Sequence, residues 1–376
     1  RQMCIRDRAR RNRVANNIIG TNLSDNPQMG NNGSGIELSD SADHNIIGPG
    51  NVISGNGECG ISAQHLRTMG NIIIGNLIGT TLDGMNALGN GTHGIWMNAP
   101  ANLIGGYTAE ERNVVSANGY FGIEIGSNNN VFGDTVRGNF IGTDITGNGA
   151  LLNSAGDLLV NNTRENWIGG LSEGAGNVMG SLNIVNEGAY DNLVRGNFIG
   201  LRADGTGPID DETIRAGIYV GDASDNIIGP GNVISGVDYG IYISEGMDPP
   251  DVFTTNNKII GNLIGTNADG TGPVANRNGI QIEHAGGNQV GGYLPEERNI
   301  VSGNDIGINI FGVDADNNLV VGNYVGTDVS GENAIPNTNG VWITEGSDNI
   351  IGGPEDGARN VISGNNDNGI WIQGSG

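Results

Sequence analysis

Apolar residues occur along this chain in short groups of two to four, each bounded by glycine or asparagine. Examples are NVIS at 51–54, NLIG at 76–79 and GIWM at 94–97. Such groups are too short and too glycine-bounded for helices, and they are typical of β-strands of a few residues. Because a strand this short cannot bury its own apolar face, the pattern predicts strands that stack on copies of themselves.

These groups recur at a fixed period. The motif GNLIGT at Gly75 returns with small changes every 58 to 65 residues, and a second motif, NVISGN at Asn51, alternates with it. Each unit therefore consists of two related halves of about 31 residues, with three short strands in each half. Repetition of this kind predicts an all-β fold, a β-solenoid of about twelve rungs.

One asparagine opens a strand in each half-unit. The predicted positions are Asn45, Asn71, Asn102, Asn130, Asn166, Asn192, Asn226, Asn257, Asn288, Asn318 and Asn349, with an earlier copy at Asn12. Asparagine tolerates the left-handed conformation, and its amide can bond to the same amide one rung away. We therefore expect a structural asparagine ladder, with glycine, 68 of the 376 residues, at the corners between strands.

Composition and charge exclude some classes of partner and bear on the domain organisation. With 17 basic and 41 acidic residues the net charge is -24, which argues against binding nucleic acid or anionic lipid. No apolar run reaches the roughly 18 residues of a membrane span, so no membrane insertion is expected. Residues 1–11 are rich in arginine and begin RQMCIRDR, which is typical of translated adapter sequence at the ends of metagenomic reading frames.

Residues 1–11 are therefore predicted to be a non-native head, a native basic arm being the alternative. Residues 12–376 are predicted to be a single β-helix domain, an internal fragment of a longer protein truncated at both ends.

The alternation of GNxIGT, GIxI, NxIGG and RNVISGN over residues 12–376 resembles the repeats of bacterial right-handed parallel β-helix proteins of the pectate-lyase-like superfamily. This resemblance implies a right-handed parallel β-helix and an extracellular or cell-surface location. It implies no single activity, because the fold hosts lyases, hydrolases, epimerases and non-catalytic adhesins.

In the G-φ-x-φ element, where φ is apolar, both apolar residues point inward and x points outward. Read rung by rung, x gives one column: Glu37, Ser62, Trp96, Glu124, Leu159, Asn183, Tyr219, Tyr242, Gln281, Asn309, Trp342 and Trp371. Aligned aromatic rings on a flat sheet suit the apolar faces of sugars, so we expect Trp96, Tyr219, Tyr242, Trp342 and Trp371 to bind an elongated glycan. The alternative is that these rings only stabilise neighbouring rungs by packing.

Catalytic candidates on this face are few. A glycosidase needs two carboxyl groups, and an eliminating lyase needs a base beside a cation. The nearest approach is Glu283 with His284, flanked by Tyr242 one rung back, and Glu124 beside Trp96 is the other isolated acid.

An acidic turn follows each GNxIGT motif. The aspartates are Asp83, Asp144, Asp204, Asp269 and Asp328. Asp-Gly is first of all a turn signal. Calcium, the one cofactor for which the sequence offers ligands, would need further oxygens beside each of these carboxylates.

The sequence favours a non-catalytic extracellular β-helix rod, a surface adhesin or spacer with an elongated glycan-binding face. A polysaccharide or cell-surface glycan and other domains of the parent protein are the expected partners. The alternative is a polysaccharide lyase or glycoside hydrolase, whose site would be marked by irregular rungs. The main irregularities are residues 148–190 and the insertion that starts at Glu245.

Overall fold

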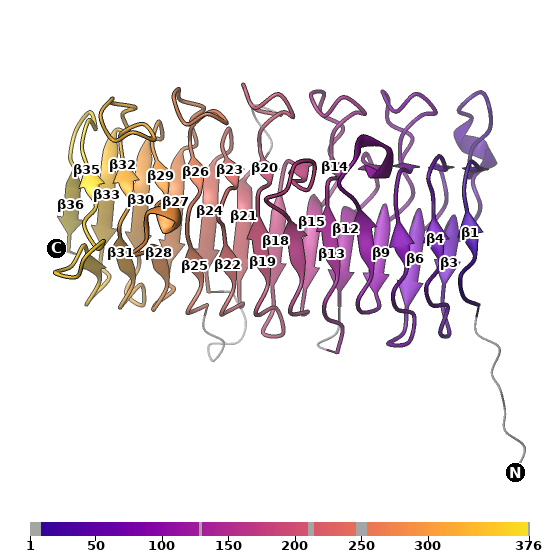
Figure 1. Ribbon diagram of the computed structural model, residues 1–376, viewed down its shortest axis with the longest axis horizontal. Coiled ribbons are helices and arrows are strands. Elements are labelled where there is room, and N and C mark those ends of the chain that lie inside the picture. Colours follow the sequence, from indigo (N-terminus) through magenta and orange to yellow (C-terminus); the bar gives the residue numbers. More distant parts are fainter. Residues whose placement is uncertain (1–8, 128–129, 210–213, 246–253, 375–376) are drawn as a thin grey trace, which may run out of the picture.

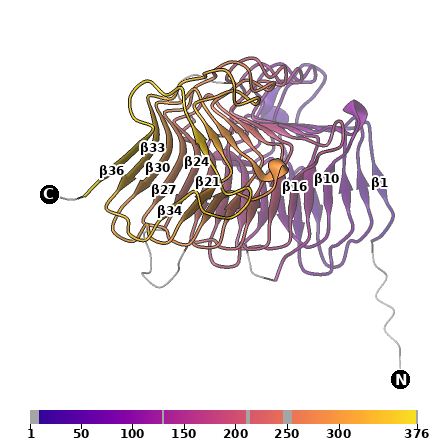
Figure 2. The same cartoon turned by 60° about the vertical axis from the view of Figure 1, so that its left-hand side comes forward.

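The chain winds into a rod of stacked rungs. The computed structural model describes residues 9–127, 130–209, 214–245 and 254–374, so most of the predicted head, residues 1–8, lies outside the described residues. Three parallel sheets of twelve strands each run along the rod (Figures 1 and 2). The predicted right-handed parallel β-helix, with about twelve rungs and three strands in each, is confirmed.

The first sheet, sheet A, is built from the strands that open each rung. In chain order they are β1 (Arg13–Val14), β4 (Ile46–Ile47), β7 (Ile72–Ile73), β10 (Leu103–Gly105), β13 (Thr135–Arg137), β16 (Trp167–Gly169), β19 (Leu193–Arg195), β22 (Ile227–Ile228), β25 (Lys258–Ile259), β28 (Gln289–Gly291), β31 (Leu319–Val321) and β34 (Ile350–Ile351).

Sheet B follows after one tight corner. Its strands are β2 (Ile18–Ile19), β5 (Val52–Ile53), β8 (Leu77–Ile78), β11 (Val114–Val115), β14 (Phe140–Ile141), β17 (Val178–Met179), β20 (Phe198–Ile199), β23 (Val233–Ile234), β26 (Leu263–Ile264), β29 (Ile300–Val301), β32 (Tyr324–Val325) and β35 (Val361–Ile362).

Sheet C has the longest strands. They are β3 (Ile36–Leu38), β6 (Ile61–Gln64), β9 (Ile95–Asn98), β12 (Phe121–Gly126), β15 (Gly156–Asn161), β18 (Leu182–Val185), β21 (Ala216–Gly221), β24 (Tyr239–Ser244), β27 (Asn278–Glu283), β30 (Ile306–Phe311), β33 (Asn339–Thr344) and β36 (Ile370–Gln373). The helical segments among the described residues are short 3-10 turns, namely η1 (Pro27–Met29), η2 (Ala109–Glu111) and η3 (Pro295–Glu297).

The core is a continuous column of aliphatic side chains inside the rod. In one rung, Ile73 from sheet A, Ile78 from sheet B and Ile95 with Met97 from sheet C are all fully buried. Branched side chains stack well on copies of themselves across parallel strands, and each fully buried one contributes about 1.5–3 kcal/mol. The apolar period of the sequence therefore fixes both the rung and its register.

Glycine is required where the corners approach the next rung. Gly79, the second glycine of GNLIGT, has φ of +86°, and a Cβ there would overlap the carbonyl oxygen of Ser116 one rung on. Gly265 repeats this geometry against Ser302. These corners explain why glycine is so abundant in this chain.

The predicted asparagines, with the exception of Asn130, form a ladder beside sheet A. Asn45 N–H, for example, donates to Asn71 Oδ1 at 2.9 Å, and Asn71 N–H donates to Asn102 Oδ1 at the same distance. The series continues through Asn166, Asn192, Asn226, Asn257, Asn288, Asn318 and Asn349. Each amide thus satisfies a buried backbone donor of the neighbouring rung.

The assignment of Asn130 to this ladder was wrong. Asn130 lies exposed in a turn, and Asp134 occupies the ladder position instead. Asn102 N–H donates to Asp134 Oδ1 at 2.7 Å, and Asp134 N–H donates to Asn166 Oδ1 at 2.9 Å. The string NVFG at 130–133 imitates the motif, but strand β13 begins only at Thr135, and an aspartate with the same shape precedes it.

Two further asparagine ladders were not predicted. One runs beside sheet B through Asn51, Asn76, Asn113, Asn139, Asn177, Asn197, Asn232, Asn262, Asn299, Asn323 and Asn360. The other precedes sheet C and has two parts, Asn56, Asn90, Asn118 and Asn153, then Asn276, Asn304, Asn337 and Asn365. The gap between Asn153 and Asn276 marks the irregular rungs.

Hairpin loops cover the outer face of sheet B at every second rung. They are closed by antiparallel bridges at Thr80–Ala87, Thr143–Ala150, Leu201–Pro208, Thr266–Pro273 and Thr327–Ala334. Successive loops bond to one another, as when Ile145 N–H donates to Gly84 O at 3.0 Å. Beneath them Val114, Phe140 and Val178 are buried, and loops rise in a row along one edge of the rod in Figure 1.

Asp134 generates a testable prediction about stability. Its carboxyl is fully buried, and its Oδ2 finds no hydrogen-bond partner among the described residues. Burial raises the pKa of Asp134 well above its ordinary value, so the native state favours the protonated form. Stability from this group is therefore full at low pH and is lost as the pH rises through the native pKa.

Asp134→Asn should stabilise the protein by about 1–3 kcal/mol at neutral pH, because an amide can be buried without ionising. At about pH 3, where Asp134 is protonated in both states, the gain should nearly vanish. Thermal melts of both proteins at the two pH values measure the effect. Exposed Asp40→Asn is the matched control, and equal gains from both substitutions would contradict the explanation.

Candidate functional site

The pairing register of sheet C places the predicted outward column in one line. Neighbouring strands pair Glu37 with Ser62, Tyr219 with Tyr242 and Trp342 with Trp371, and every intermediate pair follows the predicted order. The column includes Leu159 and Asn183, although their segments depart from the repeat motif. The aromatic candidates nevertheless fall into three separate groups along the rod.

The two tryptophans near the C-terminal rung pack against each other. The rings of Trp342 and Trp371 are 4.3 Å apart and 9° from parallel. Neighbouring strands are also separated by about 4.8 Å, so this stacking turns the ring faces along the rod axis and leaves their edges toward solvent. This geometry fits the packing alternative for these two residues.

Trp96 belongs to a different cluster. Its ring lies stacked with the imidazole of His93, with 6.3 Å between centroids, and it pairs in the sheet with Glu124. Glu124 Oε2 in turn lies 2.8 Å from His93 Nε2. The catalytic candidate Glu124 is therefore held by a histidine, and it lies outside the groove that contains the other catalytic candidates.

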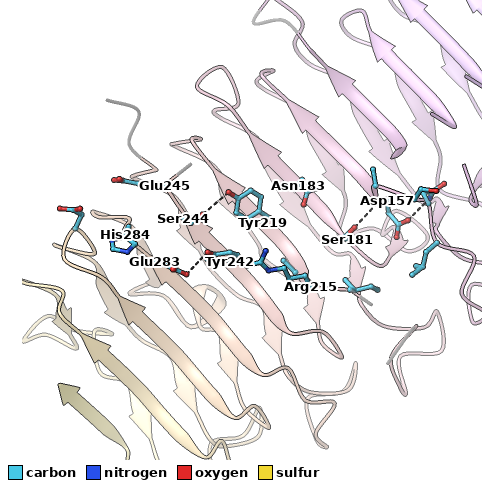
Figure 3. A pocket seen from close by; sticks show the side chains of 18 residues that line it. Asp157, Ser181, Asn183, Arg215, Tyr219, Tyr242, Ser244, Glu245, Glu283 and His284 are labelled. Carbon is cyan, nitrogen blue, oxygen red and sulfur yellow. Dashed lines mark hydrogen bonds between the residues drawn. The ribbon is translucent and has the colours of Figure 1, made fainter. Parts of the chain in front are cut away.

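That groove, of about 1000 Å³, lies on the outer face of sheet C in the middle of the rod (Figure 3). It follows from one short corner. Only Gly180 and Ser181 separate β17 from β18, whereas the other corners without a hairpin, such as 116–120, 235–238 and 302–305, have four or more residues. The hairpin corners on either side have more than ten. The third asparagine ladder is interrupted at the same place, so the surface is hollowed where a rung lacks its usual corner.

Asp157 closes the interrupted ladder at one end of the groove. Its Oδ1 accepts from Asn153 Nδ2 at 2.9 Å, and its Oδ2 accepts from Gly180 N–H at 2.6 Å. Burial raises the pKa of Asp157 to about 6 despite these bonds. At the shortened corner, the carboxyl group of Asp157 therefore accepts the hydrogen bonds that an asparagine accepts in other rungs.

Tyr219 and Tyr242 lie side by side in the groove, with their ring centroids 5.5 Å apart and the planes tilted by 52°. Tyr242 Oη donates to Glu283 Oε2 at 2.8 Å, and Ser244 Oγ donates to Tyr219 Oη at 3.2 Å (Figure 3). Burial, followed by the bond to Glu283, raises the pKa of Tyr242 to about 12, so its phenol stays protonated. Arg215 approaches the Tyr242 ring at 6.0 Å.

Acidic groups dominate the far end of the groove. Glu245, Glu283 and Asp314 line it, with His284 among them. Burial and the nearby charge of Asp314 raise the pKa of the Glu245 carboxyl, while His284 opposes the shift. The groove thus brings together Glu283, His284 and Tyr242 as predicted candidates and adds Glu245. Residues 246–253 of the predicted insertion lie outside the described residues.

The sequence did not single out Asp157, Ser181 or Arg215 as groove residues. Their positions depend on corner lengths that vary from rung to rung. The sequence did carry a signal for the groove. The segment NVMG at 177–180 runs directly into SLNIV at 181–185, so the corner there is shorter than its counterparts and lacks the asparagine of the third ladder.

The five candidate calcium ligands lie one in each of five separate loops. Asp83 accepts from Thr81 Oγ1 and Met85 N–H, Asp144 and Asp204 accept from a threonine two residues on, and Asp328 accepts from Ser330 and Asn333. Over the described ranges no three His, Cys, Asp or Glu side chains are close enough to hold a metal. The four bonded carboxylates serve their own turns, and a calcium ion would need further oxygens beside any one of them.

No helix among the described residues has the length and apolar character needed to cross a membrane.

No protein-family model matches the sequence, and no curated protein matches it. The groove must therefore be interpreted from its own chemistry.

Proposed function

We propose that this protein is an extracellular, non-catalytic β-helix rod that binds a segment of neutral polysaccharide in the groove of sheet C. The repeats and the three-sheet architecture support placing it near the pectate-lyase-like superfamily. A role as a surface adhesin or spacer, with other domains of the parent protein and a cell-surface glycan as partners, fits the regular rungs on either side of the groove.

The pair of tyrosines in the groove carries this proposal. Tyr219 and Tyr242 are half-buried and lie on neighbouring strands, in a hollow long enough to span several rungs. Aromatic rings in a concave site suit the apolar faces of sugars, and Ser244, Asn183 and Glu283 offer hydrogen bonds to hydroxyl groups.

Charge favours a neutral ligand over a polyuronate. The groove is lined by the carboxyl groups of Asp157, Glu245, Glu283 and Asp314 and by one arginine, Arg215, on a chain with a net charge of -24. A polyanion would be repelled at low salt.

Binding can be tested by affinity electrophoresis and calorimetry with neutral β-glucan, galactomannan and arabinan, and with polygalacturonate. We expect retention by at least one neutral polysaccharide, and Tyr219→Ala or Tyr242→Ala should each weaken it about tenfold, or about 1.4 kcal/mol.

Trp342→Ala is the matched control, because it truncates an aromatic residue in the same column outside the groove, and it should leave affinity within about twofold. Thermal melts check that each variant folds. Equal losses from Trp342→Ala and Tyr242→Ala, or no retention of any neutral polymer, would contradict the proposal.

A hydrolase or lyase is the second candidate, and one observation favours it. Glu245, with a raised pKa, shares the groove with Glu283, which accepts a hydrogen bond from Tyr242. Two carboxyl groups in different environments within one groove are the parts that glycoside hydrolysis uses.

The non-catalytic proposal predicts no new reducing ends and no unsaturated products from the bound polysaccharide, at neutral or mildly acidic pH. Reducing-end and ultraviolet assays over a day measure this. Suppose that products form and that Glu283→Gln and Glu245→Gln abolish their formation while binding is retained. That result would contradict the non-catalytic proposal and support the hydrolase or lyase.

A further inference from the structure

Away from the groove, Cys59, His93 and Glu124 form a chain of contacts across three rungs. Cys59 Sγ lies 3.9 Å from His93 Nδ1, and His93 Nε2 lies 2.8 Å from Glu124 Oε2. Thr92 Oγ1 also contacts the sulfur at 3.3 Å. The two imidazole nitrogens therefore face a thiol on one side and a carboxylate on the other.

The fold explains why these residues meet. Cys59 and His93 occupy the same repeat position, directly before the glycine of G-φ-x-φ, and Gly60 N–H donates to His93 O at 2.9 Å. Glu124 is in the outward column on the next strand and reaches back toward the imidazole. The spacing of stacked strands thus brings equivalent positions of neighbouring rungs into contact. We call the resulting chain of Cys59, His93 and Glu124 the relay.

Surrounding groups hold the relay in one geometry. Glu124 Oε1 accepts from Asn161 Nδ2 at 3.0 Å, and Asn161 Oδ1 accepts from Asn186 Nδ2 at 2.7 Å. The His93 ring lies between Trp96 and the edge-on ring of Tyr120, whose centroid is 5.0 Å away. The His93 and Glu124 side chains are only 15% and 7% exposed, so water screens their interaction weakly.

Electrostatics favour a charged pair. Burial alone would lower the pKa of His93, but its bonds to Cys59 and Glu124 and the charge of Glu124 raise it to about 9. Burial alone would raise the pKa of the Cys59 thiol, but bonds to His93 and Thr92 outweigh it, so the pKa is lowered. Among the described residues, Glu124 and Cys59 supply the charges that act on His93, and His93 supplies the charge that acts on Cys59.

We propose that Cys59, His93 and Glu124 form an activated-thiol site, in which the imidazole of His93, oriented by Glu124, assists the Cys59 sulfur in its reaction with small hydroperoxides. This site is independent of the proposed glycan groove. An imidazole placed between a nucleophile and an orienting carboxylate is the arrangement that activates a weak nucleophile.

The reaction balances with hydrogen peroxide as the oxidant. The Cys59 sulfur attacks one peroxide oxygen, an S–O bond forms and the O–O bond breaks. The departing hydroxide takes the proton of His93 Nδ1 and leaves as water. Sulfur is oxidised to a sulfenic acid, the peroxide is reduced, and His93 ends neutral with Glu124 still bonded to Nε2.

Burial restricts the reagent. Cys59 is 6% exposed, and the two residues that precede it in the chain, Gly57 and Glu58, are exposed. Because so little of the sulfur is exposed, we expect it to react with small reagents faster than with bulky disulfides.

The test uses the full chain carrying Cys4→Ser, so that Cys59 is the remaining thiol. Its rate of alkylation by iodoacetamide, measured against pH, should reach half of its maximum at a lower pH than for an ordinary thiol, whose pKa is about 8.5. His93→Gln should shift the profile upward and slow alkylation at that pH roughly tenfold, since the gain in thiolate is partly offset by its lower nucleophilicity.

Two further variants separate the relay from general disturbance. Glu124→Gln keeps a hydrogen-bonding side chain but removes its charge. Its pH profile of alkylation should therefore lie between the profile of the Cys4→Ser chain and that of His93→Gln. His65→Gln, which alters a histidine outside the relay, should leave the profile unchanged. Thermal melts check folding of each variant.

Peroxide should then oxidise Cys59 to a sulfenic acid that dimedone traps, and the reaction should be slower in His93→Gln. Identical alkylation profiles for the native chain and His93→Gln, or a thiol that reacts only after unfolding, would overturn the proposal. Efficient alkylation without any trapped sulfenic acid would overturn the peroxide reaction.

Discussion

Every feature of this rod depends on one constraint, the exact stacking of equivalent positions at the spacing of parallel strands. A rung of about 31 residues has too little apolar surface to fold alone, so it is stable only when its aliphatic side chains lie on those of the next rung. The asparagine ladders enforce the same register, because each amide bonds a backbone donor one rung away. A slip by one residue would break all three ladders and turn the core outward.

This constraint also decides where chemistry arises. Regular rungs repeat the same surface, so a site requires a departure from the repeat. The short corner at Gly180 removes a ladder asparagine, Asp157 replaces its bonds, and a groove opens over Tyr219. At Cys59 and His93 the corner is regular, but two reactive side chains occupy equivalent positions and are forced together.

The sequence pattern predicted the features of the structure that repeat from rung to rung. It failed to predict those that arise where the chain departs from the repeat. The outward column was predicted in full, including Leu159 and Asn183, because strand alternation is local and the core fixes the register. Asn130 was misassigned because a longer corner shifted the ladder position to Asp134. The groove depends on the relative lengths of neighbouring corners, and two ladders went unnoticed because their asparagines belong to different motifs. The Cys59–His93 contact was accessible by aligning repeats, since both residues precede the same glycine.

The geometry also changes which aromatic residues matter. In the outward column, a ring face that stacks on a neighbouring ring is not free to contact a ligand. Trp342 and Trp371 stack face to face, so each covers the surface that a sugar would need. Tyr219 and Tyr242 are tilted by 52° and lie in a hollow, and their hydroxyl groups are oriented by Ser244 and Glu283. One face of the Tyr242 ring is covered by Tyr239, whose centroid lies 5.0 Å away with the planes 24° from parallel. The tilt between Tyr219 and Tyr242 still leaves ring surface facing the hollow, and therefore the proposed binding site follows the interrupted rungs rather than the most aromatic ones.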